Sequence, residues 1–183
     1  GVVVNTCLPK TAWPPTSVKF VLPFAPQSAM RPNYSSKDGR ATRVYMPPKY
    51  RQWREKAGEW FDEWCESNDD ALLKELIYVP GTNNEKLIKD QDKFVDEFYG
   101  YEFDAVFVLS NEHGGDRLFP IMSGTADLDN YAKAVIDMMF ESSAFKDVGV
   151  NDRWIQSMNL TKRYTIGDEV SHIEVDIHQI RLG

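Results

Sequence analysis

The segment Tyr101-Glu-Phe-Asp-Ala-Val-Phe-Val-Leu109 is the clearest strand signal in the chain. It is rich in aromatic and β-branched residues, and its second half is entirely apolar. Short apolar runs of this kind are typical of strands that are buried in a sheet. The other elements are therefore placed outward from this predicted strand.

Two strands and a helix are expected on the N-terminal side of this strand. Residues 17–22 alternate between apolar and polar types, which predicts a strand, and a short returning strand is expected over 42–46. The proline pair at 47–48 then favours the start of a helix, because proline suits the first helical turn. Within residues 50–64 the aromatic side chains recur three and four positions apart, so they share one helical face. We interpret this face as core packing.

A second helix and two further strands are expected on the C-terminal side. Residues 131–140 predict the helix, while residues 154–164 and 170–180 predict a final β-hairpin. In the last of these strands apolar and polar residues alternate, which indicates one buried face and one solvent-exposed face. The order of elements predicts a single α+β domain over residues 1–183, with a mixed or antiparallel sheet and two main helices.

The charges of the chain are distributed unevenly along its 183 residues, although the formal net charge is only −7. Residues 1–56 carry ten lysines and arginines against two acids, whereas residues 57–104 carry fourteen acids against four lysines. We interpret residues 69–98 as an acidic insertion within the domain. The excess of positive charge before it favours contact with phosphate groups, despite the acidity of the whole chain.

The composition also excludes several classes of protein. Hydrophobic residues make up 42% of the chain, which is enough for a core and argues against wholesale disorder. No apolar run approaches the roughly 20 residues of a membrane span, and the first residues lack the pattern of a signal peptide. The two cysteines are too few for a disulfide framework, and the three histidines have no metal-like spacing. We therefore expect a cytoplasmic protein without a membrane association.

A group of polar residues lies at the expected entrance of the second long helix, in the sequence Asp127-Leu-Asp129-Asn130. If Asp127 to Asp129 is extended, both carboxylates point to the same side, and such hard oxygen ligands suit Mg²⁺ or Mn²⁺. Lys133 follows one helical turn after Asp129 and could hold a scissile phosphate. Asp152 supplies a third carboxylate after a loop.

Ordinary helix chemistry offers another explanation for the same residues. An Asp-x-Asp sequence before a helix is a common N-cap. Lys133 and Asp137 are four residues apart and could form a simple surface ion pair. The pattern alone leaves capping and catalysis open.

A longer pattern resembles the RusA family of Holliday-junction resolvases. The signature of that family is an Asp-x-Asp-Asn-x-x-Lys helix followed, after a loop, by an Asp-Asp pair before a strand. This chain has Asp127-Leu-Asp-Asn-Tyr-Ala-Lys133 and then Asn151-Asp152. An N-terminal strand, a proline-containing loop, a glycine-containing turn and Tyr50-Arg-Gln-Trp53 on a helix also fall in the family's order. The resemblance covers residues 17–66 and 100–180.

The resemblance implies a homodimeric, Mg²⁺-dependent endonuclease that resolves four-way DNA junctions by phosphodiester hydrolysis in recombination and repair. It also implies a bacterial or phage-encoded protein. Carried over by position, Asp127, Asp129 and Asp152 are the metal ligands and Lys133 is the catalytic lysine. The first member of the family's aspartate pair is asparagine here, so we assign the ligand to the second, Asp152, with Asp147 as the alternative.

The basic N-terminal segment would hold the DNA backbone in such an enzyme. The residues that we assign to this surface come from the first loop, the returning hairpin and the first helix, and they are Arg31, Lys37, Arg40, Arg43, Lys49, Arg51 and Arg54. The other interpretation is a solvated polar face. The large local excess of positive charge favours phosphate contact.

Two other functions stay open at this point. One is a non-catalytic DNA- or protein-binding relative of the resolvase fold, and the other is a nuclease that prefers flaps or other branched DNA. The acidic insertion over residues 69–98 sets this chain apart from a family that is usually short and basic. It could dock a protein partner, mimic DNA or simply make the chain more soluble.

Overall fold

Helices and a mixed sheet are both present in the computed structural model, which describes residues 17–37, 39–68, 100–112, 115–121, 124–147 and 151–180. The elements follow the order β1 (Ser17–Leu22), β2 (Asn33–Lys37), β3 (Arg40–Tyr45), α1 (Pro48–Ser67), β4 (Gly100–Leu109), α4 (Leu128–Phe140), α5 (Ser143–Lys146), the short 3₁₀ helix η3 (Asp152–Trp154), β5 (Ile155–Tyr164) and β6 (His172–Ile180). The predicted α+β class, with two main helices, is confirmed.

The main sheet has four strands in the order β1-β6-β4-β5. Strand β6 runs antiparallel to both β1 and β4, whereas β5 runs parallel to β4, so the sheet is mixed. The apolar segment predicted as a buried strand over residues 101–109 lies within β4, with strands on both sides of it. Its apolar character follows from this inner position.

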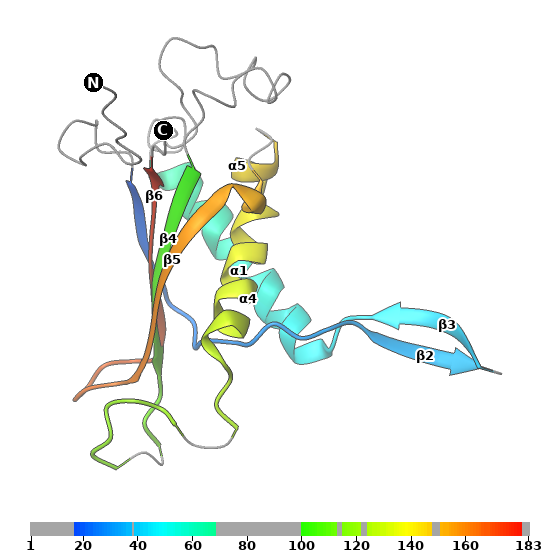
Figure 1. Cartoon of the computed structure of the whole chain (residues 1–183), viewed down its shortest axis with the longest axis horizontal. Helices are drawn as coiled ribbons and strands as arrows, with labels where there is room; N and C mark the ends of the chain where they lie inside the picture. The colour runs from blue at the N-terminus through cyan, green and yellow to red at the C-terminus, as the bar shows by residue number, and fades with distance from the viewer. Residues whose placement is uncertain are drawn as a thin grey trace, which may run out of the picture.

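The two faces of the sheet have different environments. Helices α1 and α4 lie on one face, and no described helix covers the other, which we call the open face (Figure 1). Successive side chains of a strand point to opposite faces. On β4, Tyr101, Phe103 and Phe107 are buried toward the helices. Glu102 and Asp104 alternate with them and lie on the open face, where they are half-buried.

Helix α1 packs through the aromatic face that its spacing predicted. Pro48 occupies the first turn, where its missing N–H is not needed. Ala57, Phe61 and Cys65 are buried, and the ring of Phe61 lies 5.2 Å from that of Phe20 on β1. Burial of these apolar groups drives the docking of α1 onto the sheet and confirms the core-packing interpretation.

Helix α4 is buried over most of its circumference and keeps a single polar strip. Its buried residues include Tyr131, whose ring stacks on Phe107 of β4 at 5.5 Å between centroids. Leu128 and Asn130 in the first turn are not buried, and beyond them Asp129 and Lys133 are exposed and Asp137 is half-buried. Because residues four apart share a helical side, these three polar residues form one strip.

The final two strands are present, but the prediction that they form a hairpin is wrong. Strand β4 lies between β5 and β6, so these two strands do not pair. The connection between them crosses the end of β4, where the Thr165 N–H donates to the Leu109 carbonyl at 2.8 Å. The Ser171 hydroxyl likewise donates to the Val108 carbonyl at 2.6 Å. A connection of seven residues is long enough to step over one strand.

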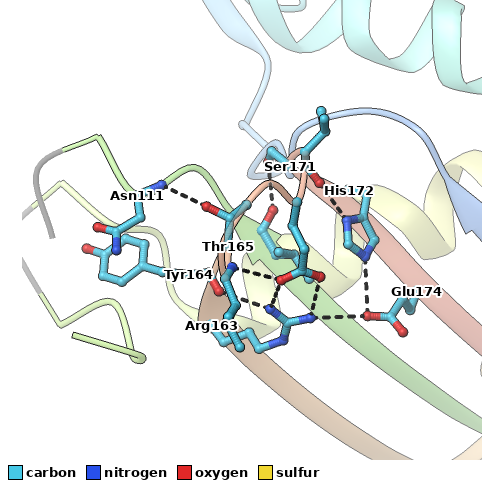
Figure 2. Close-up of polar contacts among 11 residues, drawn as sticks. Asn111, Arg163, Tyr164, Thr165, Ser171, His172 and Glu174 are labelled. Atoms are coloured by element: carbon cyan, nitrogen blue, oxygen red, sulfur yellow. Dashed lines mark hydrogen bonds and ion pairs between the residues drawn. The ribbon is translucent and has the colours of Figure 1, made fainter. Parts of the chain in front are cut away.

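A polar network holds this crossing connection in place. Arg163 makes two hydrogen bonds to Glu169, at 2.7 and 2.9 Å, which close the turn. Figure 2 shows that Arg163 also faces Glu174, which in turn contacts His172. These two-pronged arginine–carboxylate contacts are the strong kind of ion pair. The pKa of Glu169 falls to about 2, first because of the hydrogen bond from Arg163.

Strands β2 and β3 form a two-stranded arm that projects from the body of the molecule (Figure 1). The returning strand predicted over 42–46 is present as β3, and it pairs with β2, a segment expected to be loop. The chain leading into the arm is tied to the body at two points. The Ala29 N–H donates to the Asn130 carbonyl at 3.0 Å, and the Trp53 indole donates to the Ala25 carbonyl at 3.0 Å.

Residues 69–98, the predicted acidic insertion, lie outside the described residues, as do residues 1–16. The extent of a single domain over the whole chain therefore stays a prediction. None of the helices in the described part of the chain combines the length and the apolar character that a bilayer crossing requires.

Candidate metal-binding sites

A depression of about 260 Å³ lies between α4 and β5 and contains several of the predicted site residues. Asp129, Lys133 and Asp137 of the α4 polar strip line one side, and Asp152 lines it from η3. Apolar side chains complete the depression, namely Ala132, Ile136, Ile155, Met158 and Leu160. The fold thus brings together an aspartate and a lysine of the predicted motif with the more distant Asp152. We call this region the α4–β5 depression.

Lys133 makes the intrahelical contact that the surface-pair interpretation expected. Its Nζ lies 3.3 Å from Oδ2 of Asp137. The Lys133 side chain is 65% exposed, so the pair is held in solvent and contributes little to stability. Breaking it in favour of a phosphate would therefore have a small cost.

Asp127 precedes α4 as its N-cap residue, with φ of −70° and ψ of 152°. Its side chain makes no capping hydrogen bond, so the N-cap interpretation of this carboxylate lacks its main contact. Helix α4 begins at Leu128, and Asp129 is already helical. The extended arrangement considered for Asp127 to Asp129 is therefore wrong, because the chain is already helical from Leu128 onward. Asp127 is also not among the residues that line the depression.

The chain around Asp152 distinguishes it from its neighbour Asn151 and from the alternative ligand, Asp147. The Asn151 side chain accepts a hydrogen bond from the Arg153 N–H at 3.0 Å and so caps η3. Asp152 itself is exposed and faces the α4–β5 depression. The alternative ligand, Asp147, follows α5 as its C-cap and does not line the depression. These positions favour Asp152.

Lys162 on β5 is a further cation near this motif. Its position in the sequence did not indicate that it would contact the backbone just before α4. Its Nζ donates to the Ala126 carbonyl at 3.1 Å, just before Asp127. Tyr131 also bonds to the Ala126 backbone, and its pKa is raised first because the phenol is buried. These two contacts hold the entrance of α4. No local pattern could have indicated the Lys162 contact, because Lys162 is 36 residues from its partner.

A second cluster of ligand-type side chains lies on the open face of the sheet. Glu102 and Asp104 come from β4, and His178 comes from the adjacent β6, where it is the register partner of Glu102. One potential ligand atom from each residue lies within 4.8 Å of the others. We call these residues the open-face cluster, and their chemistry is suited to holding a metal ion.

The open-face cluster differs from the site that the motif predicted. Within the part of the chain that the structure describes, it is the one group of three such side chains with ligand atoms this close together. The predicted ligands Asp127, Asp129 and Asp152 do not form a group of this kind. The sequence pattern gave His178 no metal role, because spacing along the chain cannot show that β6 lies beside β4.

The basic residues assigned to DNA lie in different environments. Arg31 before the arm and Lys49 and Arg51 at the start of α1 are exposed. Lys37, Arg40 and Arg43 lie on the strands of the arm. Arg54 is instead engaged within the protein, where its guanidinium contacts Glu141 and donates to the Tyr50 hydroxyl at 3.3 Å.

No protein-family model and no curated protein matches this chain. Membership of the RusA family therefore stays a prediction that rests on the motif residues themselves.

Proposed function

We propose that this protein is a RusA-like, metal-dependent endonuclease that acts on branched DNA through the α4–β5 depression. The observation that carries the proposal is that Asp152 of η3 lines the same depression as Asp129 and Lys133 of α4. Two carboxylates and an exposed ammonium beside a small cavity match the charge requirements of a phosphodiester and its metal ion.

The donor set of the depression fits a hard divalent cation. Asp129 and Asp152 offer carboxylate oxygens, which Mg²⁺ and Mn²⁺ prefer, and no imidazole or thiol lines the depression. A bound Mg²⁺ would supply charge neutralisation at the phosphate and a lowered pKa for a water molecule. Asp127, whose carboxylate makes no capping hydrogen bond, remains the third ligand of the proposed site, although it does not line the depression.

Lys133 would stabilise the negative charge that develops on the phosphate. Its side chain is exposed, and its ion pair with Asp137 is weak. Lys133 therefore could turn toward an incoming phosphate without a large loss of stability. The apolar wall formed by Ile155, Met158 and Leu160 would limit the access of water on the opposite side.

The arm provides the most suitable surface for the DNA backbone. It carries Lys37, Arg40 and Arg43, and its leading segment is bonded to Asn130 within the motif. The segment that leads into the arm would therefore connect DNA held on the arm with the entrance of α4. Changing Arg40 and Arg43 together to alanine should weaken DNA binding. The slope of log affinity against log salt concentration should also fall by about two. An unchanged salt dependence would indicate that the DNA backbone binds another surface of the protein.

A homodimer is the assembly that suits this activity. Two symmetric cuts across a four-way junction need two copies of one site, and a two-fold dimer supplies them. Light scattering coupled to size exclusion should give the mass of two chains. A monomer that still makes paired cuts would contradict this part of the proposal.

A DNA-binding relative without turnover is the second candidate. It is favoured by the absence of a close three-carboxylate group at Asp127, Asp129 and Asp152 among the described residues. In that case the depression would recognise phosphate through Lys133 alone.

A cleavage assay separates these candidates. The protein is incubated with four-way, flap and linear DNA, in Mg²⁺ or in chelator, beside Asp129→Asn and Asp152→Asn. Branched substrates should be cut only with Mg²⁺, and both variants should be slower by about 1,000-fold or more. Asp147→Asn is the matched control and should keep its activity.

The other outcomes of this assay are equally informative. If the wild-type protein binds branched DNA and cuts none of it, the nuclease proposal is refuted and the binding relative is supported. Cutting of flaps but not of four-way junctions would support a flap nuclease. Loss of activity in Asp147→Asn, with Asp152→Asn unaffected, would move the metal ligand to Asp147.

A further inference from the structure

The open-face cluster is built across two neighbouring antiparallel strands. Glu102 and Asp104 are two residues apart on β4 and therefore point to the same face. Their register partners on β6 are His178 and Asp176. Four polar side chains thus meet on the open face, over the two central strands of the sheet.

Two outer contacts hold the ligand side chains in position. Ser157 on β5 donates its hydroxyl to Oε1 of Glu102 at 3.0 Å. Oδ1 of Asp176 lies 3.4 Å from Nδ1 of His178. These contacts leave Oε2 of Glu102 and Nε2 of His178 facing each other, 2.9 Å apart. A carboxylate behind the far nitrogen of a histidine is the usual support of a metal-bound imidazole.

The inner atoms of the cluster are buried without satisfactory partners. His178 is only 8% exposed, yet its Nε2 makes no hydrogen bond of acceptable geometry despite its short distance to Glu102. Oδ1 of Asp104 is also buried without a partner. Buried polar atoms of this kind are costly when they are left unsatisfied. A cation between them would satisfy both.

The charge balance around the cluster also favours a cation. Three carboxylates, those of Glu102, Asp104 and Asp176, surround one imidazole. The ammonium of Lys19 lies 3.7 Å from Asp176, and its side chain is 70% exposed. Excess negative charge is therefore concentrated at this point of the sheet.

We propose that Glu102, Asp104 and His178 form a Zn²⁺ site that is independent of the α4–β5 depression. An imidazole nitrogen among the ligands favours Zn²⁺ over Mg²⁺ or Ca²⁺, which prefer oxygen ligands only. Ligand atoms at about 2.1 Å from a tetrahedral ion stand about 3.4 Å apart, so the present spacing needs only small side-chain movements. Three protein ligands leave the fourth position for water.

The proposed ion would join the two central strands of the sheet. Asp104 also lines a depression of about 430 Å³ on the open face, together with Lys19, Asn159 and Thr161. This depression gives water, and a metal ion in solution, a route to the fourth position. Binding to the folded state should therefore raise the thermal unfolding midpoint of the protein.

Zinc binding to the full chain tests the proposal directly. Metal-free protein is titrated with ZnCl₂ by calorimetry, and with CoCl₂ by visible absorption, whose intensity reports tetrahedral coordination. The wild-type protein should bind one ion with an affinity better than micromolar. His178→Gln should weaken binding by more than about 100-fold, because a direct ligand contributes more than the outer contacts that support it.

Matched variants make the result specific. His172→Gln removes the other described histidine of β6, which also contacts a carboxylate, and should bind Zn²⁺ as the wild-type protein does. Asp129→Asn should also bind Zn²⁺ normally, since it alters only the α4–β5 depression. If His178→Gln fails to fold, Asp104→Asn provides the second test of the same site.

Three results would overturn the proposal. The first is a Zn²⁺ affinity of the wild-type protein that is weaker than micromolar. The second is equal binding by the wild-type protein and His178→Gln, and the third is loss of the Zn²⁺ site in Asp129→Asn. None of them bears on cleavage of DNA, so failure here is distinguishable from failure of the nuclease proposal.

Discussion

The α4–β5 depression and the open-face cluster both gather charged groups, but they differ in the elements that supply these groups and in how deeply the groups are buried. In the depression, Asp129 and Lys133 come from one strip of a helix and are exposed, and Asp152 lines the same depression. The open-face cluster takes its ligands from two strands, buries His178 and supports it from behind. Exposure suits a site that must admit a large substrate, whereas burial suits a site that holds a small ion.

The same difference explains why the two sites were not equally visible in the sequence. A helical strip repeats every three or four residues, so Asp129 and Lys133 are recognisable as neighbours. Glu102 and His178 are separated by most of the C-terminal half of the chain. Only the pairing of β4 with β6 makes them partners. Experiments that affect one site and spare the other therefore test this comparison.

The largest effect is expected from the packing that separates the two faces of the sheet. Phe107 is fully buried beneath α4 and stacks on Tyr131, whereas its neighbour Val106 is half-buried on the open face. Phe107→Ala should lower the free energy of unfolding by about 3–5 kcal/mol, because it removes a core ring and leaves a cavity. Urea unfolding measures this loss. Val106→Ala is the control, and an equal loss there would contradict the assignment of the packed face.

A slightly smaller effect is expected from the lysine of the α4–β5 depression. Lys133→Met should lower the rate of DNA cleavage by about 100- to 1,000-fold, as removal of one charge-stabilising donor commonly does. Asp137→Asn breaks the same Lys133–Asp137 pair and should leave the rate within a few fold. Single-turnover cleavage measures both. If the two variants lose activity equally, Lys133 acts only through its ion pair.

A smaller effect is expected from the residue that supports His178 in the open-face cluster. Asp176→Asn should weaken Zn²⁺ binding by about 10- to 100-fold, because the outer carboxylate orients the ligand imidazole without touching the ion. Zinc titration measures this change, and Glu174→Gln on the same strand is the control. A larger loss than that of His178→Gln would reverse the assigned roles.

The smallest effect is expected at the β5–β6 connection, away from both sites. The pKa of Glu169 is lowered from its ordinary value of 4.5 to about 2, so its pairing with Arg163 stabilises the fold above pH 4.5. This contribution disappears as the pH falls toward 2. Glu169→Gln should therefore be less stable than the wild-type protein at pH 7 and equally stable near pH 2. Thermal unfolding at the two pH values checks this, and a pH-independent difference would contradict it.

Most of the elements could be predicted from local patterns. The aromatic spacing of α1 and the apolar residues of β4 follow directly from the periods of a helix and a strand. The polar residues of α4 could also be placed on one strip from their four-residue spacing alone. The start of α4 could not be predicted as well, since both Asp127 and Asp129 are acceptable at a helix entrance. Whether the helix begins before or after Asp129 decides whether the carboxylates of Asp127 and Asp129 converge.

The pairing of strands was the main feature that local patterns did not contain. Residues 154–164 and 170–180 have all the marks of a hairpin, yet β4 lies between them. An inner position for β4 is favoured because strands on both edges satisfy its backbone groups, while the helices cover the apolar side chains on one face. Hydrogen bonds from Thr165 and Ser171 to the end of β4 then satisfy the crossing backbone.

The sequence by itself determined the α+β class, the aromatic face of α1 and the carboxylates and lysine of the motif, because each depends on residues near one another in the chain. The tertiary structure decided which carboxylates meet. It placed Asp152 beside α4, and it placed His178 beside Glu102 and Asp104. These contacts depend on strand order and register, which are set by the burial of the whole sheet and not by any single segment.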